Sequence, residues 1–127
     1  MKRVIEDIKT GEWKQIYLFT GSEDYLKLQY RDKLIQALMP EGDTMNLSRF
    51  QGKGQDVREI ISLGETMPFF AERRMIVLED TGFFKNSCGD LADYLERIPE
   101  YLYLLFVEQE ADKRGKLYKT CLLYTSP

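Results

Sequence analysis

The sequence predicts an α/β domain built on a parallel sheet of about four strands, with helices on both faces. Short apolar runs alternate along the chain with longer segments of helical periodicity. This alternation is typical of βαβ units, in which parallel strands are joined by helices that cover the sheet. The clearest run, residues 75–78 (MIVL), has the composition of a strand buried on both faces. With 127 residues, 43% of them apolar, the chain is long enough for one domain with a substantial core.

The first third of the chain predicts a helix, a strand and a second helix. Residues 1–9 place apolar side chains at helical spacing, and residues 16–19 (IYLF) form the first buried strand. The turn at residues 21–24 (GSED) supplies a capping serine and acids that suit a helix amino terminus. The helix that follows extends to about Met39, before a stop at residues 40–43. Its apolar face repeats every four residues, at Leu26, Tyr30, Leu34 and Leu38.

The middle of the chain predicts two more strands and the helix between them. Residues 45–50 (MNLSRF) alternate in polarity and are expected to form a strand that is half-buried or at an edge. Asp56 is placed to cap a helix over residues 57–65, whose apolar positions include Val57, Ile60 and Ile61. The buried strand at residues 75–78 follows.

The last third predicts a further helix and the most apolar strand. Residues 91–98 form the helix, and Pro99 ends it. Residues 101–107 (YLYLLFV) are apolar almost throughout, so we expect this strand at the centre of the sheet. Residues 112–119 begin another helix or a loop.

Composition excludes several classes of function. The net charge of −3 and pI near 5.1 argue against free-standing, non-specific binding to nucleic acid. The sequence has no histidine, which removes histidine-based triads, general bases and metal ligands together. Cys88 and Cys121 have no metal-ligand spacing and form no disulfide framework, which predicts a reducing cytoplasm. No stretch is long and apolar enough for a membrane span, and no secretory signal is visible.

Nothing in the sequence predicts a nucleotide, a metal or another cofactor. In an α/β domain the phosphate site would be the turn after the first strand, but this turn has one glycine, and Glu23 and Asp24 would repel an anion. Glu79 and Asp80 resemble the acidic strand end that helps to hold magnesium in P-loop ATPases. Without a phosphate loop, the simpler interpretation is two solvated acids. We expect no catalytic residues in this domain.

A compact basic run lies at residues 112–116 (DKRGK), after the most apolar strand. The simpler interpretation of Lys113, Arg114 and Lys116 is a solvated helix start. The alternative is a contact with a partner subunit or with a nucleic-acid backbone.

The loop before the third strand carries two adjacent phenylalanines. Pro68 keeps this stretch out of a central strand, and the preceding helix should end near Met67. Phe69 and Phe70 therefore lie on a connecting loop. The pattern alone favours rings that fold back onto the core; the alternative is an exposed pair that binds another protein.

Three segments in this order resemble the amino-terminal domain of the delta subunit of bacterial DNA polymerase III, the clamp-loader subunit that opens the sliding clamp. They are residues 16–27 (IYLFTGSEDYLK), 66–80 (TMPFFAERRMIVLED) and 92–119 (ADYLERIPEYLYLLFVEQEADKRGKLYK). The resemblance implies an AAA+ or P-loop-like architecture that lacks a working phosphate loop. It also implies membership of the DNA polymerase III holoenzyme without catalysis in this domain.

In that family, two adjacent hydrophobic residues on the loop before the third strand insert into a pocket on the clamp. The resemblance therefore implies a clamp-binding site at Met67, Pro68, Phe69 and Phe70, and it favours the exposed interpretation of the pair. The expected partners are the bacterial sliding clamp and, in the full-length protein, other clamp-loader subunits, with DNA reached only through the assembled complex. The helix at residues 57–65 is a candidate to push on the clamp.

Family members are longer, so the resemblance implies an incomplete domain at residues 1–119 and one unpaired sheet edge. Residues 120–127 do not resemble the family, and we expect them to be a non-native tail outside the fold. Two rival functions stay open at this stage. One is a nucleotide-hydrolysing enzyme of the P-loop type, and the other is a small α/β scaffold domain with the aromatic pair in its own core.

Overall fold

A computed structural model describes residues 2–20, 24–39, 45–85 and 88–125 of the chain. Within these residues, four parallel strands form one sheet in the order β1-β4-β3-β2. The predicted α/β class and the parallel sheet are therefore confirmed. The strands are β1 (Ile16–Phe19), β2 (Leu47–Gln51), β3 (Arg74–Glu79) and β4 (Leu102–Val107).

The most apolar strand lies inside the sheet, as predicted. β4 pairs with β1 on one side and with β3 on the other, so Leu104 lies opposite both Ile16 and Ile76. β2 is an edge strand and its residues are half-buried or exposed, which confirms the prediction from its alternating sequence. Every residue of β3 is buried, including the charged residues at its two ends, Arg74 and Glu79. The four apolar residues between them suit a strand that is covered on both faces.

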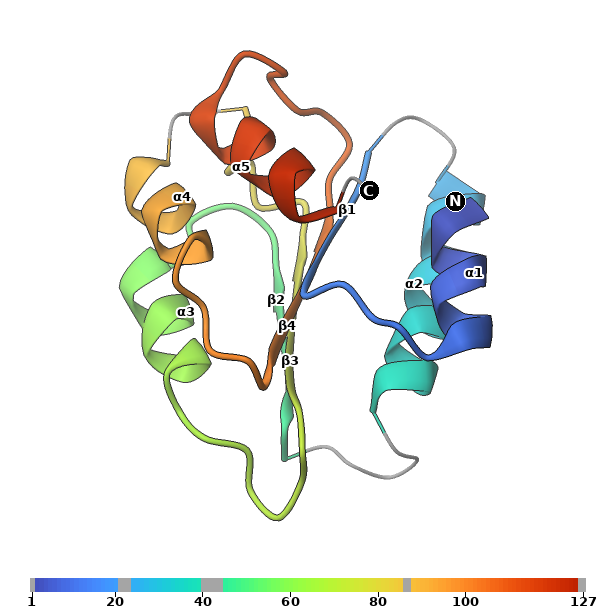
Figure 1. The fold of residues 1–127 in the computed structure, drawn as a ribbon. Helices are drawn as coiled ribbons and strands as arrows, with labels where there is room; N and C mark the ends of the chain where they lie inside the picture. The colour runs from blue at the N-terminus through green and yellow to red at the C-terminus, as the bar shows by residue number, and fades with distance from the viewer. Residues whose placement is uncertain (1, 21–23, 40–44, 86–87, 126–127) are drawn as a thin grey trace.

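Five helices of the described chain cover the two faces of the sheet (Figure 1). Two of them pack on one face, and the other three pack on the opposite face. The first pair is α1 (Lys2–Thr10) and α2 (Asp24–Leu38); the others are α3 (Val57–Gly64), α4 (Gly89–Leu95) and α5 (Lys116–Thr125).

The two faces of the sheet carry separate apolar cores. Successive side chains of a strand point to opposite faces. On β3, Met75 and Val77 belong to the core under α1 and α2, whereas Ile76 and Leu78 belong to the core under α3, α4 and α5. A strand with apolar residues at every position is needed because both faces are covered.

The predicted apolar face of α2 is correct at its end and wrong at its start. Leu34 and Leu38 are buried, but Leu26 is 38% exposed. The buried side chain of this first part is Lys27, whose ammonium donates to the backbone carbonyl of Glu108 at the end of β4. α2 therefore places a polar contact, rather than a leucine, over the carboxyl end of the sheet.

The last helix extends into residues 120–127, which the sequence-based fold prediction left out. α5 begins at Lys116, four residues later than the earliest predicted start, and continues to Thr125. Thr120 and Cys121 are buried, and Cys121 belongs to the core under α5. The boundary at residue 119 and the non-native origin of the tail stay predictions.

Two predicted features lie outside the described residues. They are Gly21, Ser22 and Glu23 of the turn after β1, and the helix stop at residues 40–43. Among the helices that the structure describes, none is long and apolar enough to cross a membrane.

Candidate functional site

The connection between α3 and β3 projects from the amino-terminal end of the sheet (Figure 1). We call residues 66–73 the aromatic loop. Phe70 is 93% exposed, Phe69 52% and Met67 74%, while Pro68 is half-buried. The pair therefore lies outside the core. The folded-back rings that the pattern alone favoured are wrong, and the exposure that the family resemblance favoured is confirmed.

The two rings have a defined arrangement. The Phe69 and Phe70 centroids lie 4.5 Å apart and the ring planes meet at 80°, the edge-to-face geometry that aromatic pairs prefer. Phe70 has a φ of 53°, a left-handed backbone conformation that is rare for a bulky residue. Such a conformation persists only where the surroundings hold it, and it is common in segments that bind ligands.

A buried asparagine holds the backbone of the loop. The side chain of Asn46, just before β2, is 1% exposed. Its amide nitrogen donates to the carbonyl of Phe69 at 2.9 Å, and its amide oxygen accepts from the Phe69 N–H at 2.6 Å. One side chain therefore satisfies both backbone polar groups of Phe69, as a neighbouring strand would do.

A buried arginine holds the start of the loop. Arg74 opens β3 and is 6% exposed. Its Nε donates to the carbonyl of Thr66 at 2.8 Å, and a terminal nitrogen donates to the carbonyl of Met67 at 3.3 Å. These contacts give the loop carbonyls partners inside the protein, so the apolar side chains are left to face outward.

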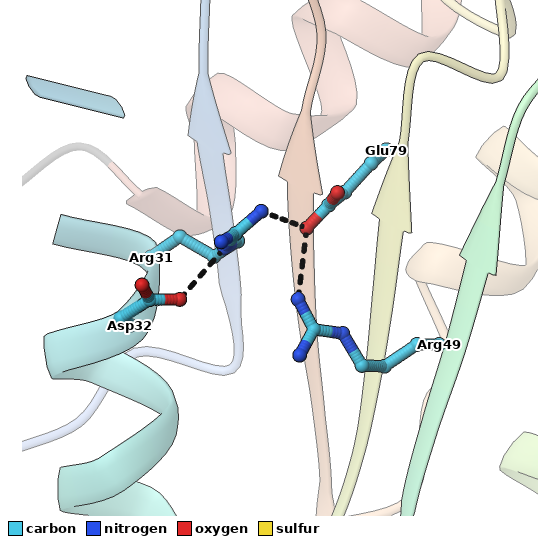
Figure 2. A network of polar contacts seen from close by, with 4 residues as sticks. All are labelled: Arg31, Asp32, Arg49 and Glu79. Atoms are coloured by element: carbon cyan, nitrogen blue, oxygen red, sulfur yellow. Dashed lines mark hydrogen bonds and ion pairs between the residues drawn. The ribbon is translucent and has the colours of Figure 1, made fainter. Parts of the chain in front are cut away.

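The opposite end of the sheet has a different character. Figure 2 shows Glu79, the last residue of β3, between two arginines from different elements. Arg31 of α2 lies 2.8 Å from a Glu79 carboxylate oxygen, and Arg49 of β2 lies 3.3 Å from the same oxygen. Arg31 also pairs with Asp32 on its own helix. Three separate elements are therefore tied together at this point.

This network corrects the interpretation of Glu79 and Asp80 as two solvated acids. Asp80 is exposed, but Glu79 is only 8% exposed and its charge is balanced by arginines. The reason is the parallel register, which places Arg49 and Glu79 on one face of neighbouring strands. In the part of the chain that the structure describes, no group of three or more acidic or cysteine side chains could hold a metal ion.

A second buried carboxyl lies beside this network. Glu108 follows β4, is 2% exposed and accepts hydrogen bonds from the backbone and hydroxyl of Thr81 and from the Gly82 N–H. Burial raises the pKa of the Glu108 carboxyl, while these hydrogen bonds oppose the rise. No pattern in the sequence pointed to this residue. It lines an open pocket of about 390 Å³, with Lys53, Asp80, Gly82, Lys85, Gln109 and Glu110.

The basic run forms a solvated turn, as the simpler interpretation predicts. Arg114 is exposed and pairs with Asp112, whose carboxylate also accepts from the Arg114 N–H. Lys116 pairs with Asp93 of α4 at the first residue of α5. The turn closed by Asp112, whose backbone carbonyl also accepts from the Gly115 N–H, occupies residues 112–115, and the helix starts directly after it.

Burial shifts both thiols toward their protonated form. Burial raises the pKa of the Cys121 thiol to about 12 and also raises the pKa of the half-buried Cys88 thiol. A thiol with a raised pKa forms little of the nucleophilic thiolate at neutral pH. Neither cysteine is a candidate for catalysis.

These observations define a class of protein: a parallel α/β domain whose most prominent surface feature is a rigid aromatic loop. The sequence profile of the family described as "DNA polymerase III, delta subunit" matches residues 17–123. The chain belongs to this family. The matched residues include the aromatic loop, Asn46, Arg74 and the first four residues of the segment 120–127.

Similar proteins agree with this assignment. The DNA polymerase III subunit delta of Bacillus subtilis (strain 168) is 27% identical to this chain. The alignment is 128 positions long and covers 91% of this chain and 37% of that protein. The solved structure of the Bacillus subtilis DNA clamp loader delta protein superposes with a TM-score of 0.85 at 24% identity, covering 97% of this chain and 40% of that one.

A more distant structure shares the fold. A DNA polymerase III gamma subunit-related protein from Thermotoga maritima superposes with a TM-score of 0.67 at 14% identity, covering 95% of this chain and 43% of that one. The chain therefore spans about two fifths of the length of these relatives.

Proposed function

We propose that this chain is the part of a clamp-loader delta subunit that contacts the sliding clamp, and that the aromatic loop makes the contact. The observation that supports this proposal most strongly is the exposure of Phe69 and Phe70 on a loop whose backbone is held from inside. An exposed apolar patch on a fixed support is typical of a protein-binding site. The loop also lies within the residues that match the delta family.

The physical basis is a binding hot spot. A phenylalanine buries about 150–250 Å² when it enters an apolar pocket. Residues that fill such pockets at an interface cost about 2 kcal/mol or more each when truncated. Met67 and Pro68 flank the pair and would line the edge of the contact.

Opening of the clamp would follow from the same contact. A bound protein shifts a two-state equilibrium only by its difference in affinity for the two states. The chain would promote opening if its docked form binds the open ring more tightly than the closed ring. α3 leads directly into the aromatic loop and is the element best placed to press on the clamp.

The wider proposals follow from the family. The full-length protein would assemble with other clamp-loader subunits in the cytoplasm, and DNA would be reached only through that complex. The architecture would be of the AAA+ type without nucleotide hydrolysis in this domain. The pairing of Glu79 with two arginines supports the lack of hydrolysis, because this carboxylate is already neutralised.

Binding to an immobilised sliding clamp of Bacillus subtilis tests the proposal. The double substitution Phe69→Ala and Phe70→Ala should weaken binding at least about a hundredfold, because two hot-spot side chains are removed. The same change should leave the free energy of unfolding within about 0.5 kcal/mol, because exposed side chains contribute little to folding.

The matched control removes two other exposed apolar side chains. Leu26 and Leu28 of α2 are 38% and 42% exposed, and Leu26→Ala with Leu28→Ala should leave clamp binding unchanged. Circular dichroism confirms that each chain is folded. Clamp binding that survives loss of both phenylalanines in a folded chain would refute the proposal.

A further inference from the structure

We propose that Asn46 and Arg74 are positioning residues for the aromatic loop. They hold its backbone in the shape that presents Phe69 and Phe70. This inference rests on the proposed function. Neither side chain is exposed enough to form a substantial contact with a partner, so both act through the loop that they hold.

Asn46 links the loop to the sheet. Its backbone carbonyl accepts from the Met75 N–H at 2.9 Å. Asn46 directly precedes Leu47, the first residue of β2 to pair with β3. Its side chain makes the two hydrogen bonds to the backbone of Phe69. The position of Phe69 is therefore set by the sheet itself, one residue before the exposed tip at Phe70.

Arg74 supplies the second attachment. Its backbone N–H donates to the carbonyl of Tyr101 at 2.9 Å, which fixes the residue beside the start of β4. Its guanidinium holds the carbonyls of Thr66 and Met67. The loop is thus held on both sides of Pro68, whose ring fixes its own φ. The tip, where Phe70 has its positive φ, lies between the Asn46 contact at Phe69 and a further contact in which the Arg73 guanidinium donates to the carbonyl of Leu38 at 3.2 Å.

The consequence for binding is preorganisation. A loop without these attachments would leave the left-handed conformation at Phe70, and its apolar rings would pack onto nearby surface. The affinity of the chain would then fall in proportion to the fraction of molecules that still hold the competent shape. A competent fraction of about one tenth weakens binding about tenfold.

The first measurement uses the unmodified chain. The Phe69 N–H donates to a buried side chain, so its hydrogen exchange should be slow, in the range of the amides of β3. Exchange at the rate of an unprotected amide would show that Asn46 does not hold the loop and would overturn the proposal.

The second measurement compares variants for binding to the immobilised sliding clamp of Bacillus subtilis. Asn46→Ala should weaken binding about tenfold at a temperature where at least about nine tenths of the chain is folded, so that unfolding alone cannot explain the loss. Gln15→Ala is the matched control. The Gln15 amide donates to the carbonyls of Pro99 and Leu102 at the same end of the sheet, at 2.7 and 3.1 Å. This variant should lose comparable stability and keep full affinity.

The outcomes separate the two proposals. If the double phenylalanine variant loses binding and folded Asn46→Ala binds like the unmodified chain, the positioning role is overturned and the proposed function stands. If the double phenylalanine variant still binds, both proposals fall. If Asn46→Ala does not fold, Arg74→Met replaces it. This variant keeps an apolar stem and removes the donors to the carbonyls of Thr66 and Met67. It too should weaken clamp binding about tenfold, and unchanged binding would overturn the positioning role.

Discussion

The two ends of β3 use buried polar side chains in opposite ways. At the amino end, Arg74 and the neighbouring Asn46 donate to the backbone of a loop and leave its aromatic rings in solvent. At the carboxyl end, Glu79 is neutralised by Arg31 and Arg49, and these charged groups bind one another. The amino end presents a surface to another molecule, whereas the charged groups at the carboxyl end pair with one another inside the protein.

This difference shows where a function can reside in an α/β sheet. Ligands of such sheets usually bind at the carboxyl ends of the strands. Here that end has a mixed-charge pocket and a paired carboxylate, while the exposed apolar surface lies at the amino end. Changes at the carboxyl end should therefore affect stability, and changes on the aromatic loop should affect binding.

The largest effect on stability is expected from Glu79→Ala. It leaves the half-buried Arg31 with only the exposed Asp32, and we expect a loss of about 3 kcal/mol in the free energy of unfolding, at the lower end of the range for broken buried ion pairs. Urea denaturation measures this loss. Affinity for the clamp, corrected for the folded fraction, should not change.

Asp80→Asn is the matched control for this substitution. Asp80 is the neighbouring exposed acid, and asparagine tolerates its φ of 53°. This change should alter the free energy of unfolding by less than about 0.5 kcal/mol. A binding defect in folded Glu79→Ala would show that the two ends of β3 are coupled. It would contradict the claim that changes at the carboxyl end affect stability alone.

Gly64→Ala tests whether the helix before the loop, rather than its side-chain attachments, fixes the loop. A Cβ at Gly64 would clash with the Tyr94 hydroxyl and lie 2.9 Å from Leu102 Cδ2, and this overpacking should cost about 2 kcal/mol. Adding Tyr94→Phe removes the closer contact and should restore part of the stability. The affinity of the folded variant for the clamp should not change, because Asn46 and Arg74 are unchanged. A tenfold loss of affinity would show that α3, rather than these two side chains, positions the loop.

The smallest effect is expected from the pH dependence of Glu108. Because its pKa is raised above the ordinary 4.5, the folded chain retains this proton at pH values where the unfolded chain has lost it. The free energy of unfolding therefore falls as pH rises from about 4.5 through the raised pKa of the folded chain, and this contribution is constant above it. Glu108→Gln should remove this fall. A difference between the two chains that is independent of pH across this range would contradict the assignment.

Most of the fold could be predicted from periodicity and composition. Apolar runs located three of the four described strands, alternating polarity located β2, and the density of apolar residues in β4 predicted its internal position. Such features are local in the sequence. The start of α5 was not resolved in this way. Asp112 accepts from the Arg114 N–H in a turn, and Gly115 directly precedes the first helical residue, so residues 112–115 stay outside the helix.

The candidate site was only partly visible in the sequence. Pro68 placed the two phenylalanines on a loop, and the resemblance to the delta family favoured their exposure. Asn46 and Arg74 were missed. Arg74 is a charged residue at the start of a buried strand, which is a usable signal, whereas Asn46 lies before the half-buried edge strand β2 and has no such signal. The pairing of Arg31 with Glu79 joins residues 48 apart and depends on how α2 crosses the sheet. No local pattern encodes that contact.

The most direct test of the central claim is hydrogen exchange of the chain with and without the sliding clamp, which reports the end of the sheet that the clamp covers. The account predicts that the clamp slows exchange at residues 66–73 and leaves the amides around Asp80, Gly82 and Glu108 unchanged. Protection at the carboxyl end with none on the aromatic loop would contradict it.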